Sequence, residues 1–168
     1  MKRSSCGVTH MECVILIGLP GSGKSTFYRE RFAGTHDLVS KDIMRHNRQP
    51  QRRQEQLIAE SLAAGHSVVI DNTNPRVADR APIIAIARRF GAALAGYFFP
   101  TDAAVALRRN RAREGRDRVP DVAIFTTRKR LELPTYDEGF DHLFIVDVKE
   151  ETRSFDVRPQ PRKPETQP

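Results

Sequence analysis

The feature that most constrains the fold is a glycine-rich segment, residues 18–26, with the sequence GLPGSGKST. It fits the pattern G-x-x-x-x-G-K-[ST], with an apolar run before it and a helix-like stretch after it. Glycines let the backbone curl until successive N–H groups point at one place, which favours bound phosphate groups. The segment therefore predicts a strand, a phosphate-binding loop (P-loop) and a helix.

Apolar runs and helical stretches alternate along the rest of the chain without an internal repeat. The runs are rich in Val, Ile and Phe, and several are apolar throughout, which is typical of strands covered on both faces. The predicted strands are 13–17, 38–39, 67–70, 92–99 and 143–148, and the predicted helices are 24–33, 50–64, 75–90, 102–113 and 120–131. This alternation predicts an α/β P-loop NTPase fold, a five-stranded parallel sheet with helices on both faces and an Arg-rich lid.

Glycine and proline set the expected helix ends. Gly65 stands where the second helix should stop, and Asn74-Pro75 is expected to be an N-cap followed by a first-turn proline. Pro82 is expected to kink or split the third helix.

The length of 168 residues predicts one domain. We expect a flexible N-terminal tail at 1–11, the P-loop domain at 12–150, and a disordered tail rich in proline and charge at 151–168. Cys6 and Cys13 form neither a disulfide framework nor a metal-ligand pattern. No apolar run is long enough for a membrane span or an export signal, so we expect a cytoplasmic protein with no membrane partner.

The net charge is +7 and most of the basic residues are arginine. A basic surface concentrates polyanions, which favours an acidic partner such as nucleic acid. An arginine-rich composition also occurs for reasons unrelated to binding, so the net charge alone barely favours a nucleic-acid partner.

Three polar positions follow apolar strands. In parallel α/β sheets ligands bind beyond the carboxyl ends of the strands, so Gly18, Asp42 and Asp71 are expected to meet in one crevice. In the P-loop, Lys24 is expected to reach the β- and γ-phosphates of ATP, and the Ser25 hydroxyl to ligate Mg²⁺. The residues expected to bind ATP are Gly18, Gly21, Ser22, Gly23, Lys24, Ser25 and Thr26.

Asp42 and Arg45 are one helical turn apart and share a face. Asp42 near the γ-phosphate is suited to accept a proton from an attacking hydroxyl, although it also fits as the cap of a helix starting at Ile43. Arg45 beside it is suited to grip a phosphate of the acceptor, and is equally understandable as a solvated surface arginine.

Two further segments carry candidate residues. Asp71-Asn72-Thr73-Asn74 follows a strand, so that Asp71 is suited to a water-mediated Mg²⁺ contact, or the segment is simply a polar turn. Residues 108–118, RRNRAREGRDR, favour a mobile lid whose guanidinium groups neutralise transferring phosphate, or a solvated helix end.

Together these residues resemble the kinase domain of polynucleotide 5′-hydroxyl kinases, over about residues 13–146. GLPGSGKSTF, VVIDNTNP and RKRLELPTYDEGF are similar to the animal end-healing enzyme. Asp42-x-x-Arg45 and Arg109-Asn-x-x-Arg113 are similar to the phage enzyme. Lys41 stands where an arginine usually precedes the aspartate, and the D-x-D-x-T motif of the accompanying phosphatase is not found.

The resemblance implies transfer of the ATP γ-phosphate to the 5′-hydroxyl end of DNA or RNA in end healing. It implies Asp42 as general base, with Lys24 and Arg113 as further catalytic residues. It assigns Arg109 and Arg113 to the lid over ATP, and Arg45, Asp71, Asn72 and Thr73 to the acceptor. A phosphatase or ligase acting on the same ends is expected to be a separate partner.

Two alternatives share much of this pattern. A small-molecule kinase for a sugar, nucleoside or antibiotic would use the same loop, aspartate and lid. A non-enzymatic switch that binds ATP would need the P-loop but would have no need of Asp42 or Arg45.

Overall fold

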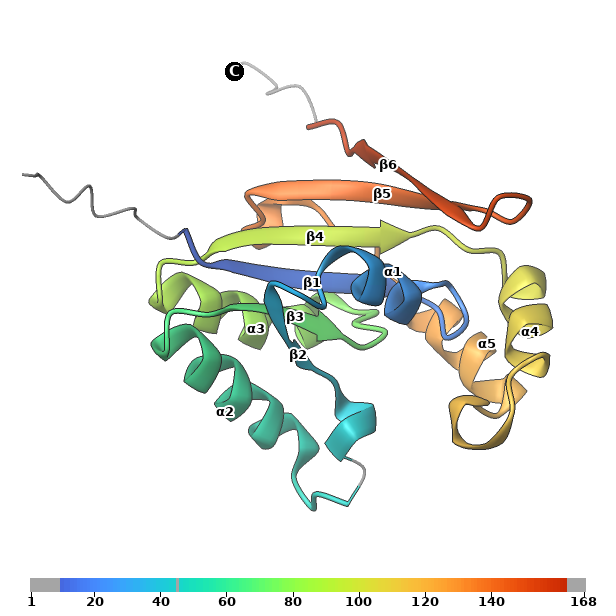
Figure 1. Cartoon of the computed structure of the whole chain (residues 1–168), viewed down its shortest axis with the longest axis horizontal. Coiled ribbons are helices and arrows are strands. Elements are labelled where there is room, and N and C mark those ends of the chain that lie inside the picture. Colours follow the sequence, from blue (N-terminus) through green and yellow to red (C-terminus); the bar gives the residue numbers. More distant parts are fainter. Residues whose placement is uncertain (1–9, 45, 163–168) are drawn as a thin grey trace, which may run out of the picture.

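The computed structural model describes residues 10–44 and 46–162, which form one mixed six-stranded sheet with helices packed around it (Figure 1). The strand order is β2-β3-β1-β4-β5-β6, with β1 to β5 parallel. The strands are β1 (Glu12–Gly18), β2 (His36–Val39), β3 (Ser67–Asp71), β4 (Ala93–Phe99), β5 (His142–Lys149) and β6 (Ser154–Pro159). The helices are α1 (Lys24–Arg31), α2 (Pro50–Ala63), α3 (Val77–Arg89), α4 (Ala103–Arg111) and α5 (Asp121–Arg130). Three short 3₁₀ turns, η1 (Lys41–Met44), η2 (Gly115–Asp117) and η3 (Tyr136–Glu138), complete the described elements.

The predicted P-loop fold is confirmed, but the strand count is six rather than five. β6 pairs antiparallel with β5, so the expectation of a disordered tail is wrong for Ser154–Pro159. Phe155 and Val157, two residues apart on this strand, present their side chains to one apolar cluster. The Phe155 ring lies 5.1 Å from the ring of Phe27 in α1. Two apolar side chains on alternate positions are enough to fix an edge strand on a sheet that already exists.

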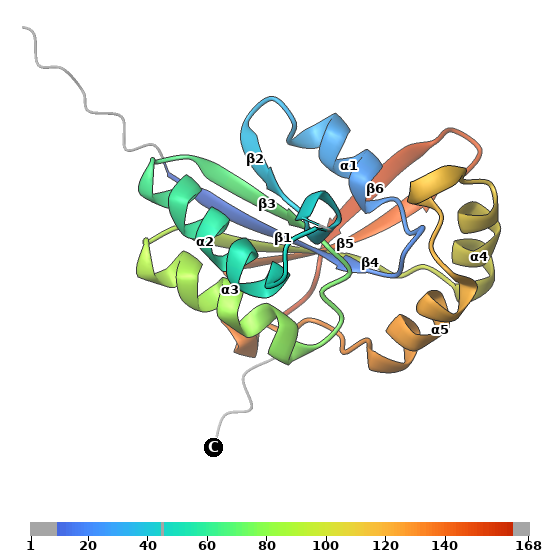
Figure 2. The ribbon, with the colours of Figure 1, turned by 90° about the horizontal axis from the view of Figure 1, so that it is seen from below.

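The two faces of the sheet are covered by different helices. β1 is central and buried along almost its whole length, as its unbroken apolar sequence predicts. α2 and α3 lie together on one face of the sheet, as the view in Figure 2 shows. α1 packs on the other face through Phe27 and Phe32, among aromatic side chains of β4, β5 and β6. In the part of the chain that the structure describes, no helix has both the length and the apolar content to cross a membrane.

The start of α3 differs from the expectation. The helix begins at Val77 rather than after an Asn74 cap, because Asn74 takes a left-handed conformation (φ 43°) and its side-chain amide donates to the Leu16 carbonyl at 2.7 Å. Pro82 does not split the helix, which runs unbroken to Arg89. Gly65 (φ 82°) follows the end of α2 as predicted.

Strand register brings the chemistry-bearing segments to one edge. Leu16 of β1 lies beside Asp71 of β3, so the P-loop after β1 and the polar segment after β3 leave the sheet side by side. α4 and α5 lie beyond this same edge (Figure 1). The cleft expected at the carboxyl ends of the strands therefore has helices on its far side.

Candidate active site at the carboxyl edge of the sheet

A cavity of about 700 Å³ opens at the carboxyl edge of the parallel strands. Its walls come from the P-loop, η1, the segment between β3 and α3, the loop around η2, and α5. The sequence-predicted residues that line it are Gly21, Ser22, Gly23, Lys24, Ser25, Thr26, Asp42, Asp71, Asn72, Thr73 and Arg113. Arg45 lies outside the described residues.

Two P-loop glycines have different structural reasons. Gly23 has φ 99° at the start of α1, a left-handed conformation that a side chain would strain. Gly21 has φ 80°, and a Cβ there would lie 2.9 Å from the Ala106 carbonyl oxygen of α4. Position 21 must therefore lack a side chain for two reasons. α4 packs closely against it, and the N–H groups of the loop must be accessible to phosphate.

Lys24 is buried beneath the P-loop. Its Nζ donates to the carbonyl oxygens of Gly18 (3.0 Å) and Leu19 (2.6 Å) and to the Ser22 hydroxyl (3.1 Å). Burial lowers the pKa of Lys24 to about 8, against the opposing pull of the Asp71 and Asp42 carboxylates. The ammonium is thus held in a site that favours a nearby anion, which a phosphate would provide.

Ser25 and Asp71 meet across the ends of two neighbouring strands. The Ser25 hydroxyl donates a 2.6 Å hydrogen bond to Asp71 Oδ2. Mg²⁺ prefers oxygen ligands and usually binds through one or two protein groups plus substrate phosphates, so this hydroxyl and carboxylate fit it. Within residues 10–44 and 46–162, no three His, Cys, Asp or Glu side chains are grouped so that they could hold a metal ion.

Asp42 lies in η1 and lines the cavity that Lys24 also lines. The Asp42 carboxylate opposes the effect of burial on the pKa of Lys24, so the two charged groups lie close enough to interact. The backbone N–H of Lys41 donates to Asn72 Oδ1 at 2.8 Å, and the Asn72 amide donates to Gln54 of α2 at 2.7 Å. Asn72 therefore ties the Asp42 segment to the sheet edge and to α2.

Thr73 contacts the start of the P-loop through its backbone carbonyl group. Its carbonyl oxygen accepts a 3.1 Å hydrogen bond from the Gly18 N–H, at the point where the P-loop leaves β1. Gly18, which was expected to bind ATP, is the last residue of β1 and does not line the cavity. The β3–α3 segment is thus held to β1 by Thr73 and, as described above, by Asn74.

The structure separates the two arginines expected in the lid. Arg113 lines the cavity and donates to the Asp117 carbonyl at 3.4 Å. Arg109 is absent from the lining, because its guanidinium contacts the Gly21 carbonyl (3.4 Å) and Glu150 (2.9 Å). Glu150 follows β5 in the turn to β6 and also pairs with Arg108 at 2.6 Å. The β5–β6 turn therefore anchors α4, which sequence patterns did not predict.

Helix α5 contributes lining residues that the sequence analysis did not predict. Thr126, Thr127 and Arg130 of α5 line the cavity. The spacings of three and four residues from the threonines to Arg130 put all three on one face of the helix, which is the signal that identifies them.

This sheet order, with a P-loop between β1 and α1 and with α4 and α5 beyond the carboxyl edge of the sheet, defines a protein with the P-loop kinase fold. The chain belongs to the AAA_33 family (AAA domain), which matches residues 13–134.

The predicted resemblance to polynucleotide kinases is confirmed. The chain is 30% identical over 144 residues to a bifunctional polynucleotide phosphatase/kinase of Schizosaccharomyces pombe, which covers 83% of this chain and 34% of that protein. A relative from Acanthamoeba polyphaga mimivirus is 29% identical over 144 residues, or 80% of this chain and 33% of its own length. The chain thus spans about a third of the length of the curated relatives it matches. A solved sugar kinase from Janibacter sp. HTCC2649 shares the fold, with a TM-score of 0.61, 18% identity and coverage of 82% of this chain and 85% of that one.

Proposed function

We propose that this protein transfers the γ-phosphate of ATP to the 5′-hydroxyl end of a nucleic acid. The observation that carries the proposal is that the P-loop and Asp42 line one cavity, with the Asp71–Thr73 segment between them along its wall. A nucleotide phosphate on the loop and a hydroxyl beside Asp42 would share that space. The relatives named polynucleotide phosphatase/kinase support the choice of a polynucleotide end over other alcohols.

The chemical step needs two roles from the chain, a general base and groups that neutralise charge. The acceptor hydroxyl oxygen forms a bond to the γ-phosphorus, the bond from that phosphorus to the β–γ bridging oxygen breaks, and ADP leaves. Asp42 takes the hydroxyl proton as general base. Lys24 and Arg113 neutralise the charge that spreads over the transferring oxygens.

Ser25 and Asp71 are proposed to hold the magnesium ion, Ser25 directly and Asp71 through water. When bound, the ion would neutralise negative charge on the phosphates of ATP. The short contact between these two side chains supports this assignment, because it fixes both oxygens on the same side of the cavity.

Arg45, three residues after Asp42 in the sequence, is proposed to bind the first phosphate of the acceptor strand. Thr73, Thr126, Thr127 and Arg130 are proposed to line the rest of the acceptor path. Contacts to phosphate position a strand without reading its bases, so the enzyme should tolerate any sequence.

The test is transfer of labelled γ-phosphate from ATP to matched DNA and RNA oligonucleotides with 5′-hydroxyl ends. Oligonucleotides of the same sequence carrying a 5′-phosphate are the controls, and free nucleosides and sugars are offered in parallel. We expect label only on the 5′-hydroxyl ends, with acceptor binding that weakens steeply as salt rises. Label on a sugar or nucleoside instead would establish a small-molecule kinase. ATP binding and slow hydrolysis with no labelled acceptor would establish a nucleotide-dependent switch.

A further inference from the structure

Arg80 of α3 is the largest fully buried side chain among the described residues. It has no exposed surface and shares a face of α3 with Ile83 and Ile84 of the core, three and four residues on. A buried charge is costly unless it is paired and hydrogen-bonded, so the contacts of Arg80 must offset a large desolvation penalty. The sequence gives no sign of this role beyond a charge inside an apolar helix.

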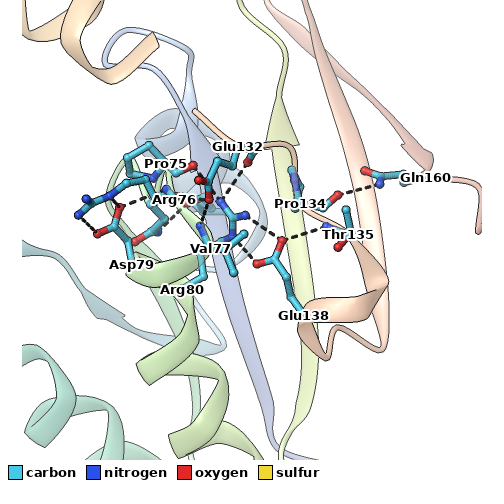
Figure 3. Close-up of polar contacts among 12 residues, drawn as sticks. Pro75, Arg76, Val77, Asp79, Arg80, Glu132, Pro134, Thr135, Glu138 and Gln160 are labelled. Carbon is cyan, nitrogen blue, oxygen red and sulfur yellow. Dashed lines mark hydrogen bonds and ion pairs between the residues drawn. The ribbon is translucent and has the colours of Figure 1, made fainter. Parts of the chain in front are cut away.

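The Arg80 guanidinium uses both of its edges (Figure 3). Nε and Nη2 form a two-point ion pair with the Glu138 carboxylate, at 2.7 and 2.8 Å. Nη1 donates to three backbone carbonyls, those of Asn74 (3.0 Å), Pro75 (3.1 Å) and Glu132 (3.2 Å). Glu138, in η3, is also nearly buried, with 5% of its side chain exposed.

Two of these carbonyls belong to one wall of the cavity, and the third lies in the chain just after another wall. Asn74 and Pro75 lie in the segment between β3 and α3, which lines it. Glu132 comes two residues after Arg130, the last residue of α5 and part of another wall. Arg80 therefore joins the residues after α5 to the segment after β3.

The same junction is closed by two more hydrogen bonds. The Glu132 N–H donates to the Pro75 carbonyl at 2.8 Å, and the Val77 N–H donates to the Glu132 carboxylate at 2.6 Å. Figure 3 shows Glu132 between Pro75, Val77 and Arg80. The segment after β3 is thus held at its start on β1, by Thr73 and Asn74, and at its end on the residues after α5.

We propose that Arg80 is a positioning residue that fixes the spacing between the two walls enclosing the acceptor, an inference that rests on the proposed function. Loss of its carbonyl contacts frees the far end of the β3–α3 segment and the base of α5. The P-loop keeps its own contacts to Lys24 and to Thr73, so the nucleotide site is affected less than the acceptor site.

Arginine is required because of its shape. Its planar fork serves a carboxylate along one edge and carbonyls at another corner at the same time, whereas a lysine ammonium is a single point with three donors. Arg80→Lys therefore keeps the charge opposite Glu138 while it loses part of the carbonyl set. Glu138→Gln removes the opposing charge at constant shape.

The experiment measures steady-state kinetics of the full chain with a 5′-hydroxyl oligonucleotide, together with ATP affinity and the thermal midpoint. For Arg80→Lys we expect kcat/KM for the acceptor to fall on the order of 10- to 100-fold, as small misplacements of a reacting group do. We expect the Kd for ATP to change by no more than about twofold. Glu138→Gln should move the same parameters in the same direction.

Arg88→Lys is the matched control. Arg88 also connects α3 to the chain beside η3, through Asp141 at 2.9 Å and the Gly139 carbonyl, but it is half exposed and lies off the cavity. It should leave the acceptor kinetics unchanged, even if it lowers the thermal midpoint.

The outcomes separate cleanly. If Arg80→Lys has a lower thermal midpoint but wild-type acceptor kinetics, Arg80 is only structural and the inference is wrong. The same holds if the variant raises the KM for the acceptor and the Kd for ATP by the same factor. If Arg80→Lys does not fold, Glu132→Ala decides, because this exposed side chain closes the same junction and its loss should weaken the acceptor alone. A wild-type protein that phosphorylates no 5′-hydroxyl end overturns the proposed function itself, and this inference with it.

Discussion

The Ser25 hydroxyl donates a 2.6 Å hydrogen bond to the Asp71 carboxylate, although the two residues are 46 positions apart in the chain. The parallel register of β1 and β3 produces this contact, since it brings Asp71, the last residue of β3, beside the start of the helix that follows β1. A hydroxyl and a carboxylate held at this distance form a small oxygen site next to the phosphate loop.

Asp71→Asn is expected to lower activity by about 10- to 100-fold and to raise the Mg²⁺ concentration needed for half-maximal rate. The asparagine oxygen can still accept from Ser25, so the change removes charge and keeps the shape. A titration of activity against Mg²⁺ measures both effects. Asp37→Asn is the control, because Asp37 pairs with His66 at the other end of β2. An unchanged magnesium requirement in Asp71→Asn would remove Asp71 from the metal site.

Asp42→Ala is expected to lower turnover by roughly 10²–10⁴-fold, the usual contribution of a general base, with ATP affinity retained. The measurement is kcat for the oligonucleotide beside the Kd for ATP. Near wild-type turnover in this variant would show that Asp42 is not the base.

ATP affinity is expected to fall as pH rises above about 8, the value to which burial lowers the pKa of Lys24. Bound phosphates favour the ammonium and raise its pKa, so ATP binding takes up a proton in the interval between the two values. The loss should approach tenfold per pH unit for one linked proton. Calorimetry between pH 7 and 9.5 in buffers of different ionisation enthalpy measures it.

Lys24→Arg is the control for this pH dependence. An arginine stays charged throughout this range, so any remaining ATP affinity should vary little with pH. The same decline in both proteins would place the titrating group elsewhere.

Arg113→Ala is expected to reduce kcat on the order of 10²-fold, because its guanidinium lines the cavity where charge would develop. Arg109→Ala should reduce kcat less and should mainly weaken ATP affinity, since Arg109 contacts the Gly21 carbonyl of the P-loop and Glu150. Comparison of kcat and KM for ATP in the two variants measures the difference. Equal losses of kcat would show that both arginines reach the phosphates.

Phe155→Ala is expected to lower the free energy of unfolding by about 1–2 kcal/mol, because its ring packs on Phe27 and is only partly buried. Chemical denaturation measures the change. Phe125→Ala, which truncates a ring that is 45% exposed on α5, should change it little. Equal stability of the two variants would mean that β6 adds nothing to the packing of the sheet.

The local sequence determined the strands, the helices and the phosphate loop, because these depend on periodicity and on glycines at fixed spacing. It also predicted that Asp42 and Asp71 share one cavity, since strand ends in a parallel sheet share an edge, although Gly18 of the same prediction does not line it. It did not predict β6, where two apolar residues in a charged stretch fold only against a sheet already built. It also assigned Arg109 and Arg113 to the same site. In the structure Arg109 pairs with Glu150 of the β5–β6 turn, whereas Arg113 lines the cavity.

Only the tertiary structure decided which polar residues support the site rather than line it. The backbone carbonyls that Arg80 holds belong to segments more than 50 residues apart, and Asn72 joins Lys41 to Gln54 in the same way. No local pattern encodes such contacts, because a buried polar side chain must be satisfied by whichever groups the completed fold brings to it.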